Sequence, residues 1–258
     1  MDGDMVPAGS RDAGLLMVLS RPTLALEEAY HRWYDEEHIP ARTRLPGWLT
    51  ARRYVSNDGT GTYLAYYDLE DIGLLSVPDY VSLRENRSTL ERTILESADF
   101  VDRRIYRSRP SQTPDLDLPT KESPGPPLTE SGDISKVDAW APPIGFSGNL
   151  QICGPVLLCV WWEPYPGTED EFNAWYEEEH LPMLATVPGW LRSRRFDLVE
   201  GNGQRYLAMH DLAGTEVFAD ARYREAISTR RRDAVVAQRS SHERGVFQLL
   251  RRLDPEPM

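Results

Sequence analysis

The chain has 258 residues, of which 40% are hydrophobic, and its 41 acidic and 29 basic side chains give a net charge of −12. This length is enough for two small domains with separate cores. A protein that neutralises phosphates needs a basic face, and the longest uninterrupted basic run is Arg230 to Arg232. Nucleic acid is therefore excluded as the main partner.

Membrane-spanning and disulfide-rich classes are excluded next. Residues 1–13 lack the basic-then-apolar order of a signal peptide, and no apolar run approaches the roughly 20 residues that span a bilayer. Cys153 and Cys159 are too few for a disulfide scaffold or a four-ligand zinc site. We expect a soluble cytoplasmic protein with reduced thiols, no metal site and no membrane partner.

The first half, residues 14–108, follows a flexible N-terminus at 1–13. Pro and Gly before Trp48 break the preceding helix, and the Asn, Asp and Gly residues of 56–62 favour a hairpin turn. The predicted elements are, in chain order, a strand at 15–19, a helix at about 26–38, a strand from Trp48, a strand from Thr62, a helix at about 79–96 and a strand at about 100–107.

A segment rich in Pro, Ser, Thr, Asp and Gly, residues 109–149, separates this half from the second one at 150–253, and residues 254–258 form a tail. Such a composition buries too little apolar surface to fold, so we expect a linker. The second half is predicted to contain a strand at 157–161, a helix beginning near Glu169, strands from Trp190 and Arg205, a helix at about 219–239 and a strand at about 246–252.

The two halves repeat each other. Residues 30–54 (YHRWYDEEHIPARTRLPGWLTARRY) align with residues 172–196 (FNAWYEEEHLPMLATVPGWLRSRRF), and 12 of these 25 positions are identical. Internal repetition of this kind indicates a duplicated structural unit. The order βαββαβ in each unit is typical of a ferredoxin-like sheet with helices on one face. We expect an α+β chain in which two ferredoxin-like repeats pack sheet to sheet as an intramolecular pseudo-dimeric α/β barrel, burying both bare faces.

The motif W-Y-x-x-E-H-x-P followed by P-G-W, present as WYDEEHIP with LPGW and as WYEEEHLP with VPGW, resembles the dimeric α/β barrel superfamily, most closely its EthD-like branch. The resemblance covers both halves. It implies a ligand pocket between the helices and the sheet of each half. It does not select a reaction, since the superfamily includes cofactor-free monooxygenases, polyketide cyclases, isomerases, decarboxylases and haem enzymes.

Candidate proton-transfer residues end the apolar stripe of the first helix in each half. The stripe reads Phe172, Trp175, Tyr176, Glu179, His180 in the second half and Tyr30, Trp33, Tyr34, Glu37, His38 in the first. A partly desolvated carboxylate beside an imidazole can move protons on an enolisable substrate. The predicted catalytic residues are His180, His38, Glu179, Glu37 and His210, the last being aligned with Tyr67 of the first half.

Structural roles are the alternatives. Glu37 or Glu179 could bind arginines of the following strand, and His38 and His180 could cap helix ends. Alternation places Tyr206 and His210 on one face of their strand, which the sequence does not identify. Aromatic side chains suit a flat ligand but also fill cores. The predicted substrate-binding residues are Trp175, Tyr176, Trp161, Tyr206, Arg194, Trp33, Tyr34, Tyr63, Tyr67 and Arg52.

These observations lead to a functional hypothesis. We expect an enzyme without a cofactor that acts on an apolar or aromatic, polyketide-like small molecule by His, Glu and Tyr acid–base chemistry, as a cyclase, decarboxylase, dehydratase or isomerase of secondary metabolism. One alternative is a binding or accessory protein that holds such a molecule unchanged. A further alternative is a haem enzyme or a cofactor-free monooxygenase.

Overall fold

The structure is a computed structural model that describes residues 12–109 and 152–253. Most of the predicted linker, the N-terminal 11 residues and the tail lie outside these ranges, so their boundaries remain predictions. Arg109, which we assigned to the linker, is instead the last residue of strand β4 (Phe100–Arg109).

The halves contain the same elements in the same order. In the first half these are β1 (Gly14–Arg21), α1 (Glu27–Trp33), a π-helical turn (Tyr34–His38), α2 (Ile39–Thr43), β2 (Trp48–Ser56), β3 (Tyr63–Leu69), α3 (Pro78–Glu85), α4 (Thr89–Ser97) and β4. In the second half these are β5 (Val156–Pro164), α5 (Glu169–Trp175), a π-helical turn (Tyr176–His180), α6 (Leu181–Ala185), β6 (Trp190–Glu200), β7 (Tyr206–Leu212), α7 (Ala221–Ala226), α8 (Arg230–Ala237) and β8 (Arg239–Leu253).

The first predicted helix continues beyond His38, where we expected it to end. Proline inside a helix normally breaks it, because its ring clashes with a carbonyl and its N–H is missing. Here the π-helical turns directly precede Pro40 and Pro182. Hydrogen bonds from residue i to i+5 can skip a missing N–H. The repeated E-H-x-P motif therefore builds a widened turn, of a kind often found at functional sites.

The second predicted helix of each half is two helices. Ser88 accepts a hydrogen bond from the backbone N–H of Glu91 at 3.0 Å and begins α4. Thr229 does the same for Arg232 at 3.1 Å and begins α8. A hydroxyl at the N-cap satisfies an amide that a continuous helix would bond internally. These two caps thus align Glu91 with Arg232.

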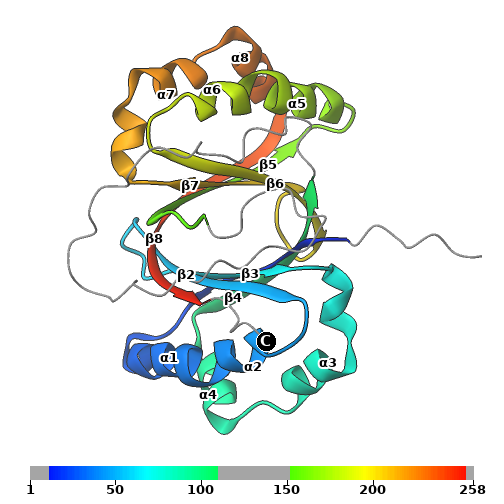
Figure 1. The fold of residues 1–258 in the computed structure, drawn as a ribbon, viewed down its shortest axis with the longest axis vertical. Coiled ribbons are helices and arrows are strands. Elements are labelled where there is room, and N and C mark those ends of the chain that lie inside the picture. The colour runs from blue at the N-terminus through cyan, green and yellow to red at the C-terminus, as the bar shows by residue number, and fades with distance from the viewer. Residues whose placement is uncertain (1–11, 110–151, 254–258) are drawn as a thin grey trace, which may run out of the picture.

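Eight antiparallel strands form a closed barrel in the order β1-β3-β2-β8-β5-β7-β6-β4. The four strands of each half lie next to one another in the barrel. The two halves join where β2 pairs with β8 and where β4 pairs with β6. Helices α1 to α4 cover one side of the barrel and α5 to α8 the opposite side (Figure 1). This arrangement confirms an α+β chain that encloses its own barrel.

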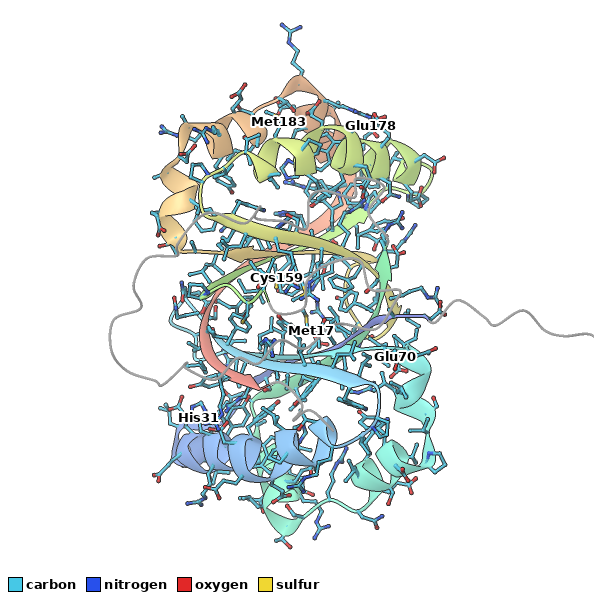
Figure 2. All side chains as sticks on the ribbon, in the orientation of Figure 1. Met17, His31, Glu70, Cys159, Glu178 and Met183 are labelled. Atoms are coloured by element: carbon cyan, nitrogen blue, oxygen red, sulfur yellow. The ribbon has the colours of Figure 1, made fainter. Side chains whose placement is uncertain are left out.

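Strand alternation gives each sheet a barrel side and a helix side. Met17 and Cys159, from opposite halves, both lie inside the barrel, between the sheets (Figure 2). Separate aromatic clusters pack between the sheets and the helices, around Trp33 and Tyr67 in the first half and Trp175 and Tyr206 in the second. Among the described residues, no helix has the length and apolar character needed to cross a membrane.

Candidate functional site

The side of the sheet on which each residue lies decides which candidates can meet. His210 contacts Trp190 with a ring separation of 4.9 Å, and Trp190 packs in the helix-side cluster with Leu184. The barrel side of the same strand instead carries Met209. The alternation left open by the sequence is therefore settled, because Tyr206 and His210 both face the helices that carry His180.

His180 is held in one orientation at the end of the π-helical turn. Its ring stacks on Trp175 with centroids 4.4 Å apart and planes 22° apart. Its Nδ1 lies 3.2 Å from the carbonyl oxygen of Ala226 in α7. A carbonyl can only accept, so Nδ1 carries the hydrogen and donates it. In the neutral ring, Nε2 is then left with a lone pair that can accept a proton.

His210 is oriented by a hydrogen-bonded chain across the sheet. The indole Nε1–H of Trp190 donates to Ser193 Oγ at 2.9 Å, and Ser193 Oγ lies 2.8 Å from His210 Nδ1. Because Trp190 can only donate, the hydroxyl hydrogen of Ser193 is available for His210 Nδ1. If Ser193 donates to Nδ1 in this way, the ring hydrogen of His210 lies on Nε2. The two histidines therefore have complementary tautomers.

Burial keeps both rings neutral. The pKa of His180 is lowered to about 3, chiefly by desolvation, with Arg232 and Arg195 contributing and the bond to Ala226 opposing. The pKa of His210 is also lowered to about 3, again chiefly by desolvation and next by the nearby His180. Removing an imidazole from water disfavours its charged form. Near neutral pH, one ring is a hydrogen-bond acceptor at Nε2 and the other a donor.

The first half keeps the position of this cluster but not its hydrogen bonds. Tyr67 replaces His210, and Ala51 replaces Ser193 between Trp48 and the β3 ring. His38 packs against Trp33 with centroids 4.3 Å apart. Four buried polar atoms here have no hydrogen-bond partner among the described residues: Trp33 Nε1, His38 Nδ1, Trp48 Nε1 and Tyr67 Oη. In the second half, Trp175 Nε1 is unpartnered but Trp190 and both imidazoles are hydrogen-bonded.

The charge beside each helix-end histidine also differs. His38 Nδ1 lies 3.8 Å from the buried carboxylate of Glu91, which is also 3.8 Å from Arg42. Desolvation raises the pKa of Glu91, although Arg42 and Arg87 oppose the rise. The pKa of His38 is lowered well below its usual value, chiefly by burial. The equivalent of Glu91 near His180 is the guanidinium of Arg232, so a carboxylate and a guanidinium occupy the same position in the two halves. Arginines lower the pKa of the imidazole in both halves.

The carboxylate of Glu179 binds a helix cap instead of an arginine of the following strand. Glu179 accepts a hydrogen bond from Thr229 Oγ1, the cap of α8, which ties it to the helix layer. The anticipated bond to a β6 arginine is made two residues earlier by Glu177, which lies 3.0 Å from Arg195. Asp35 and Arg53 make the same contact in the first half at 3.1 Å. Stripe spacing finds the face of a helix but not the residue whose carboxylate reaches the strand.

Three predicted substrate-binding residues lie on the wrong side of the sheet to meet His180. Trp161 is part of the apolar cluster inside the barrel. Arg194 extends over the barrel-side rings of Tyr66 and Phe196, each 5.4 Å from its guanidinium carbon, and Arg52 occupies the equivalent position on β2. Arginines one residue further along, Arg53 and Arg195, face the helices instead.

The other predicted tyrosines lie on the helix side. Arg53 stacks 4.2 Å from the ring centroid of Tyr34, and Arg195 stacks 4.3 Å from that of Tyr176. Tyr63 donates a hydrogen bond to Glu27 at the edge of the first cluster. These side chains therefore line the helix side of the sheet, and their contacts also hold the helices against it.

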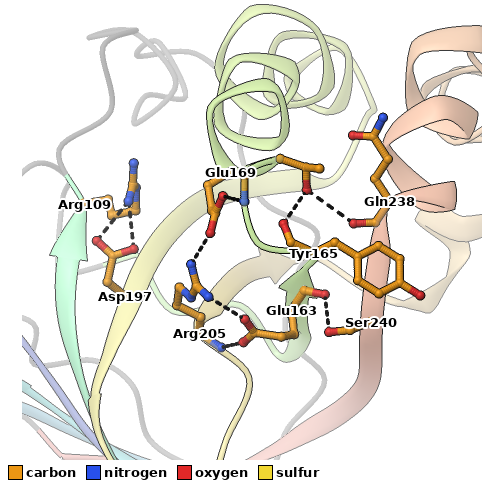
Figure 3. A network of polar contacts seen from close by, with 10 residues as sticks. Arg109, Glu163, Tyr165, Glu169, Asp197, Arg205, Gln238 and Ser240 are labelled. Atoms are coloured by element: carbon orange, nitrogen blue, oxygen red, sulfur yellow. Dashed lines mark hydrogen bonds and ion pairs between the residues drawn. The ribbon is translucent and has the colours of Figure 1, made fainter.

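A polar network at the edge of the second half fixes the start of α5 (Figure 3). Arg205 donates to Glu169, the first residue of α5, and lies 3.0 Å from Glu163 of β5. Glu169 also accepts from the backbone N–H of Gly167 at 2.6 Å. A carboxylate in the first helical turn is favoured by the helix dipole. This anchor determines where the helix that carries Trp175 meets the sheet.

Sequence reasoning missed Ser193, Trp190, Glu91 and the carbonyl group of Ala226. Ser193 could have been found, because it is one of the few positions at which the aligned strands differ in hydrogen-bonding capacity. Glu91 and Ala226 give no such signal, since their partners lie in other elements. Only the packing of α4 and α7 over the sheet brings them to the imidazoles.

In the described ranges, no three or more His, Cys, Asp or Glu side chains are grouped to hold a metal ion. Haem requires a histidine nitrogen that faces an open slot. Trp175 stacks on the face of His180 at 4.4 Å, and Trp190 lies 4.9 Å from His210 with the two ring planes tilted by 59°. These contacts select neither imidazole as a haem ligand.

Comparisons with known proteins were made at the level of sequence and of structure. No family model and no curated protein matches the sequence. An anthrone oxidase-like protein matches the structure with a TM-score of 0.61 and 13% identity over 95% of this chain and 94% of that one. A provisionally named monooxygenase from Fusobacterium nucleatum gives 0.60 and 9%, over 97% and 98% of the chains.

A chlorite dismutase from Candidatus Nitrospira defluvii gives a TM-score of 0.53 and 9% identity over 93% of this chain and 92% of that one. At such low identities, these matches establish the fold and leave the chemistry open. The chain is therefore similar in fold to the dimeric α/β barrel proteins, with an eight-stranded antiparallel barrel covered by helices on two sides.

Proposed function

We propose that this protein is a cofactor-independent enzyme that performs acid–base chemistry on an enolisable aromatic or polyketide-like molecule, with the second-half histidines as its catalytic residues. The observation that supports this most strongly is the complementary pair, in which His180 presents a lone pair and His210 presents an N–H. We also propose that the halves are tandem ferredoxin-like repeats of the EthD-like type, supported by the strand order 4-1-3-2 and its equivalent 8-5-7-6.

The two rings would divide the work of enolisation. His180 Nε2 takes a proton from the carbon next to a carbonyl group, and His210 Nε2–H donates a hydrogen bond to the carbonyl oxygen, where negative charge develops. Without substrate, Arg232 and Arg195 disfavour the charged His180 ring. An enolate formed beside the ring offsets that repulsion. The charged His180 ring is therefore stabilised mainly in the transition state of proton transfer.

Fused aromatic ligands suit this location. Trp175, Tyr176 and Trp190 supply flat apolar surfaces around the imidazoles. Cyclisation, dehydration and isomerisation all proceed from an enolate and differ in which bond next breaks or forms. Decarboxylation of a β-keto acid forms the enolate itself by loss of carbon dioxide, and the same N–H of His210 would stabilise it. The substrate's own leaving groups would select among them.

A second candidate is a cofactor-free monooxygenase acting on an anthrone-like phenol. It is favoured by the likeness to an anthrone oxidase-like protein over nearly the whole of both chains. The first step, removal of a proton to form an electron-rich carbanion, is the same. Dissolved oxygen consumed in proportion to substrate would support the oxygenase, whereas turnover under argon would support the lyase or isomerase.

The test is turnover of an anthrone or an aromatic β-ketone by single variants of both halves. His180→Ala and His210→Ala are expected to lower kcat by about 10² to 10⁴, the usual contribution of a positioned acid or base. His38→Ala is the matched control and should lower it much less. Equal losses in all three would remove the assignment to the second half. Saturable quenching of tryptophan fluorescence without any product would favour a binding protein instead.

A further inference from the structure

A polar cluster lies inside the barrel, on the opposite side of the sheets from the histidines. Asp68 accepts from Thr50 and from Arg194 of the other half, both at 2.5 Å. Asp211 lies 2.8 Å from Arg192, and it also accepts the backbone N–H of Gly154 at 3.0 Å. Charged groups are rare inside proteins unless they are paired and hydrogen-bonded. Each donor of this cluster therefore needs a partner.

Arg192 and Arg194 have the same N–H donors but use them differently. Arg192 uses its side-on edge, Nε and Nη2, to bind one oxygen of Asp211 at 2.9 and 2.8 Å. Arg194 binds Asp68 only through Nη1, and its Nε and Nη2 are buried without a hydrogen-bond partner. That edge is a planar fork whose two parallel N–H groups match a carboxylate. The fork is filled in Arg192 and free in Arg194.

A third unpartnered donor stands beside this fork. The guanidinium carbon of Arg194 is 5.4 Å from the ring centroid of Tyr66, and the Tyr66 hydroxyl is buried with no partner among the described residues. The side chain of Arg194 is only 6% exposed. Burying such a donor without an acceptor destabilises the folded protein, and a charged donor does so more than a neutral one. Three unpaired donors at one place inside the barrel are therefore unfavourable unless an acceptor binds there.

We propose that the barrel interior binds a small carboxylate anion, held side-on by Arg194 Nε and Nη2 and capped by the hydroxyl of Tyr66. A carboxylate has two oxygens for the fork and a lone pair left for the phenol. The planar fork discriminates against spherical anions, which cannot make two parallel bonds. The site is independent of the proposed enolisation, because Ser193 and Arg195, the neighbours of Arg194 on β6, face the helices.

The test is thermal unfolding in sodium formate at constant ionic strength, with sodium chloride as the balancing salt. The wild-type midpoint should rise saturably with formate, since a ligand that binds only the folded state stabilises it. Arg194→Lys keeps a positive charge for Asp68 but lacks the fork, and Tyr66→Phe removes one hydroxyl. Both variants should lose most or all of the formate response.

Tyr54→Phe is the matched control, because Tyr54 stacks on Tyr66 at 6.0 Å but directs its hydroxyl to Gly154 and Cys153. It should keep the full response, as should His180→Ala. A formate response that is absent from the wild type, or is retained by both Arg194→Lys and Tyr66→Phe, would overturn the proposal. Should Arg194→Lys fail to fold, Tyr66→Phe alone decides between these outcomes.

Discussion

The two halves of this protein place the same motif in the same turn but surround it differently. In the second half, His180 is bonded to Ala226, and Trp190, Ser193 and His210 form a continuous hydrogen-bonded chain. In the first, Ala51 interrupts that chain, and the hydroxyl of Tyr67 and the indole of Trp48 are both buried without partners. One duplicated scaffold thus supports one organised pair of imidazoles and one loosely paired aromatic cluster.

This difference suggests how a fused pair can divide its tasks. In both halves the helix-end histidine packs on a tryptophan of its own helical segment, and the aromatic residues of that segment pack against the sheet. If only one half carries out chemistry, then only that half needs a serine that orients a second imidazole, as Ser193 does. Preorganised hydrogen bonds, rather than the presence of the motif, then distinguish the halves.

Breaking the ion pair inside the second half should have the largest effect on stability. Arg192→Thr introduces the residue that the first half has at this position and leaves Asp211 buried without its cation. We expect a loss of about 3 to 5 kcal/mol in the free energy of unfolding. Thr50→Val, the counterpart change, removes one hydrogen bond to Asp68 and should cost about 1.5 to 3 kcal/mol. Urea denaturation with equal m-values for both variants measures the contrast, and equal losses would contradict it.

The pH dependence of stability should come next. His180 and His210 have pKa values lowered to about 3 in the folded state, whereas the unfolded chain protonates them near pH 6.5. As the pH falls from 6.5 toward 3, only the unfolded state gains these protons, so folding weakens by about 1.4 kcal/mol per pH unit for each histidine. The stability is fully present above pH 6.5.

The variant His210→Tyr places the first-half residue at this position and should reduce that slope by one histidine's contribution. Chemical denaturation at pH 7, 6 and 5 provides the measurement. A slope identical to that of the wild type would show that His210 is already accessible to protons in the folded protein.

Loss of the hydroxyl that orients His210 should have a moderate effect. Ser193→Ala removes the acceptor for Trp190 and the partner of His210 Nδ1, at a cost of about 1 to 3 kcal/mol because two buried groups lose a partner. The tautomer of His210 should become mixed, which nitrogen-15 NMR of the imidazole can follow. Ser193→Thr, which retains a hydroxyl, is the control and should keep one tautomer.

Adding the missing hydroxyl to the first half should have the smallest effect. Ala51→Ser offers an acceptor to the buried indole of Trp48, and the hydrogen bond should stabilise the chain by about 0.5 to 1.5 kcal/mol. Comparison of thermal midpoints with those of Ala51→Gly, which adds no acceptor, tests this. Destabilisation by serine would show that the site has no room for the hydroxyl.

Much of the architecture could be predicted from the repeat alone. The order of strands and helices followed from the alignment of the two sequence repeats. The spacing of the aromatic residues indicated which face of the first helix packs inward. The breaks at Ser88 and Thr229 were missed, because an N-cap inside a helical pattern competes with helix continuation only once the second segment packs elsewhere. The partner of Glu179 was missed for the same reason, since Thr229 begins the unexpected helix α8.

The sequence by itself determined that one module is used twice, since apolar spacing and turn residues are local properties that a duplicated text must repeat. Only the tertiary structure decided which strand face meets the helices, which carboxylate reaches which arginine, and that Asp68 binds Arg194 across 126 positions of the chain. Those outcomes depend on closure of the barrel, because β2 and β8, and β4 and β6, bring the halves into contact through pairings that neither half specifies alone.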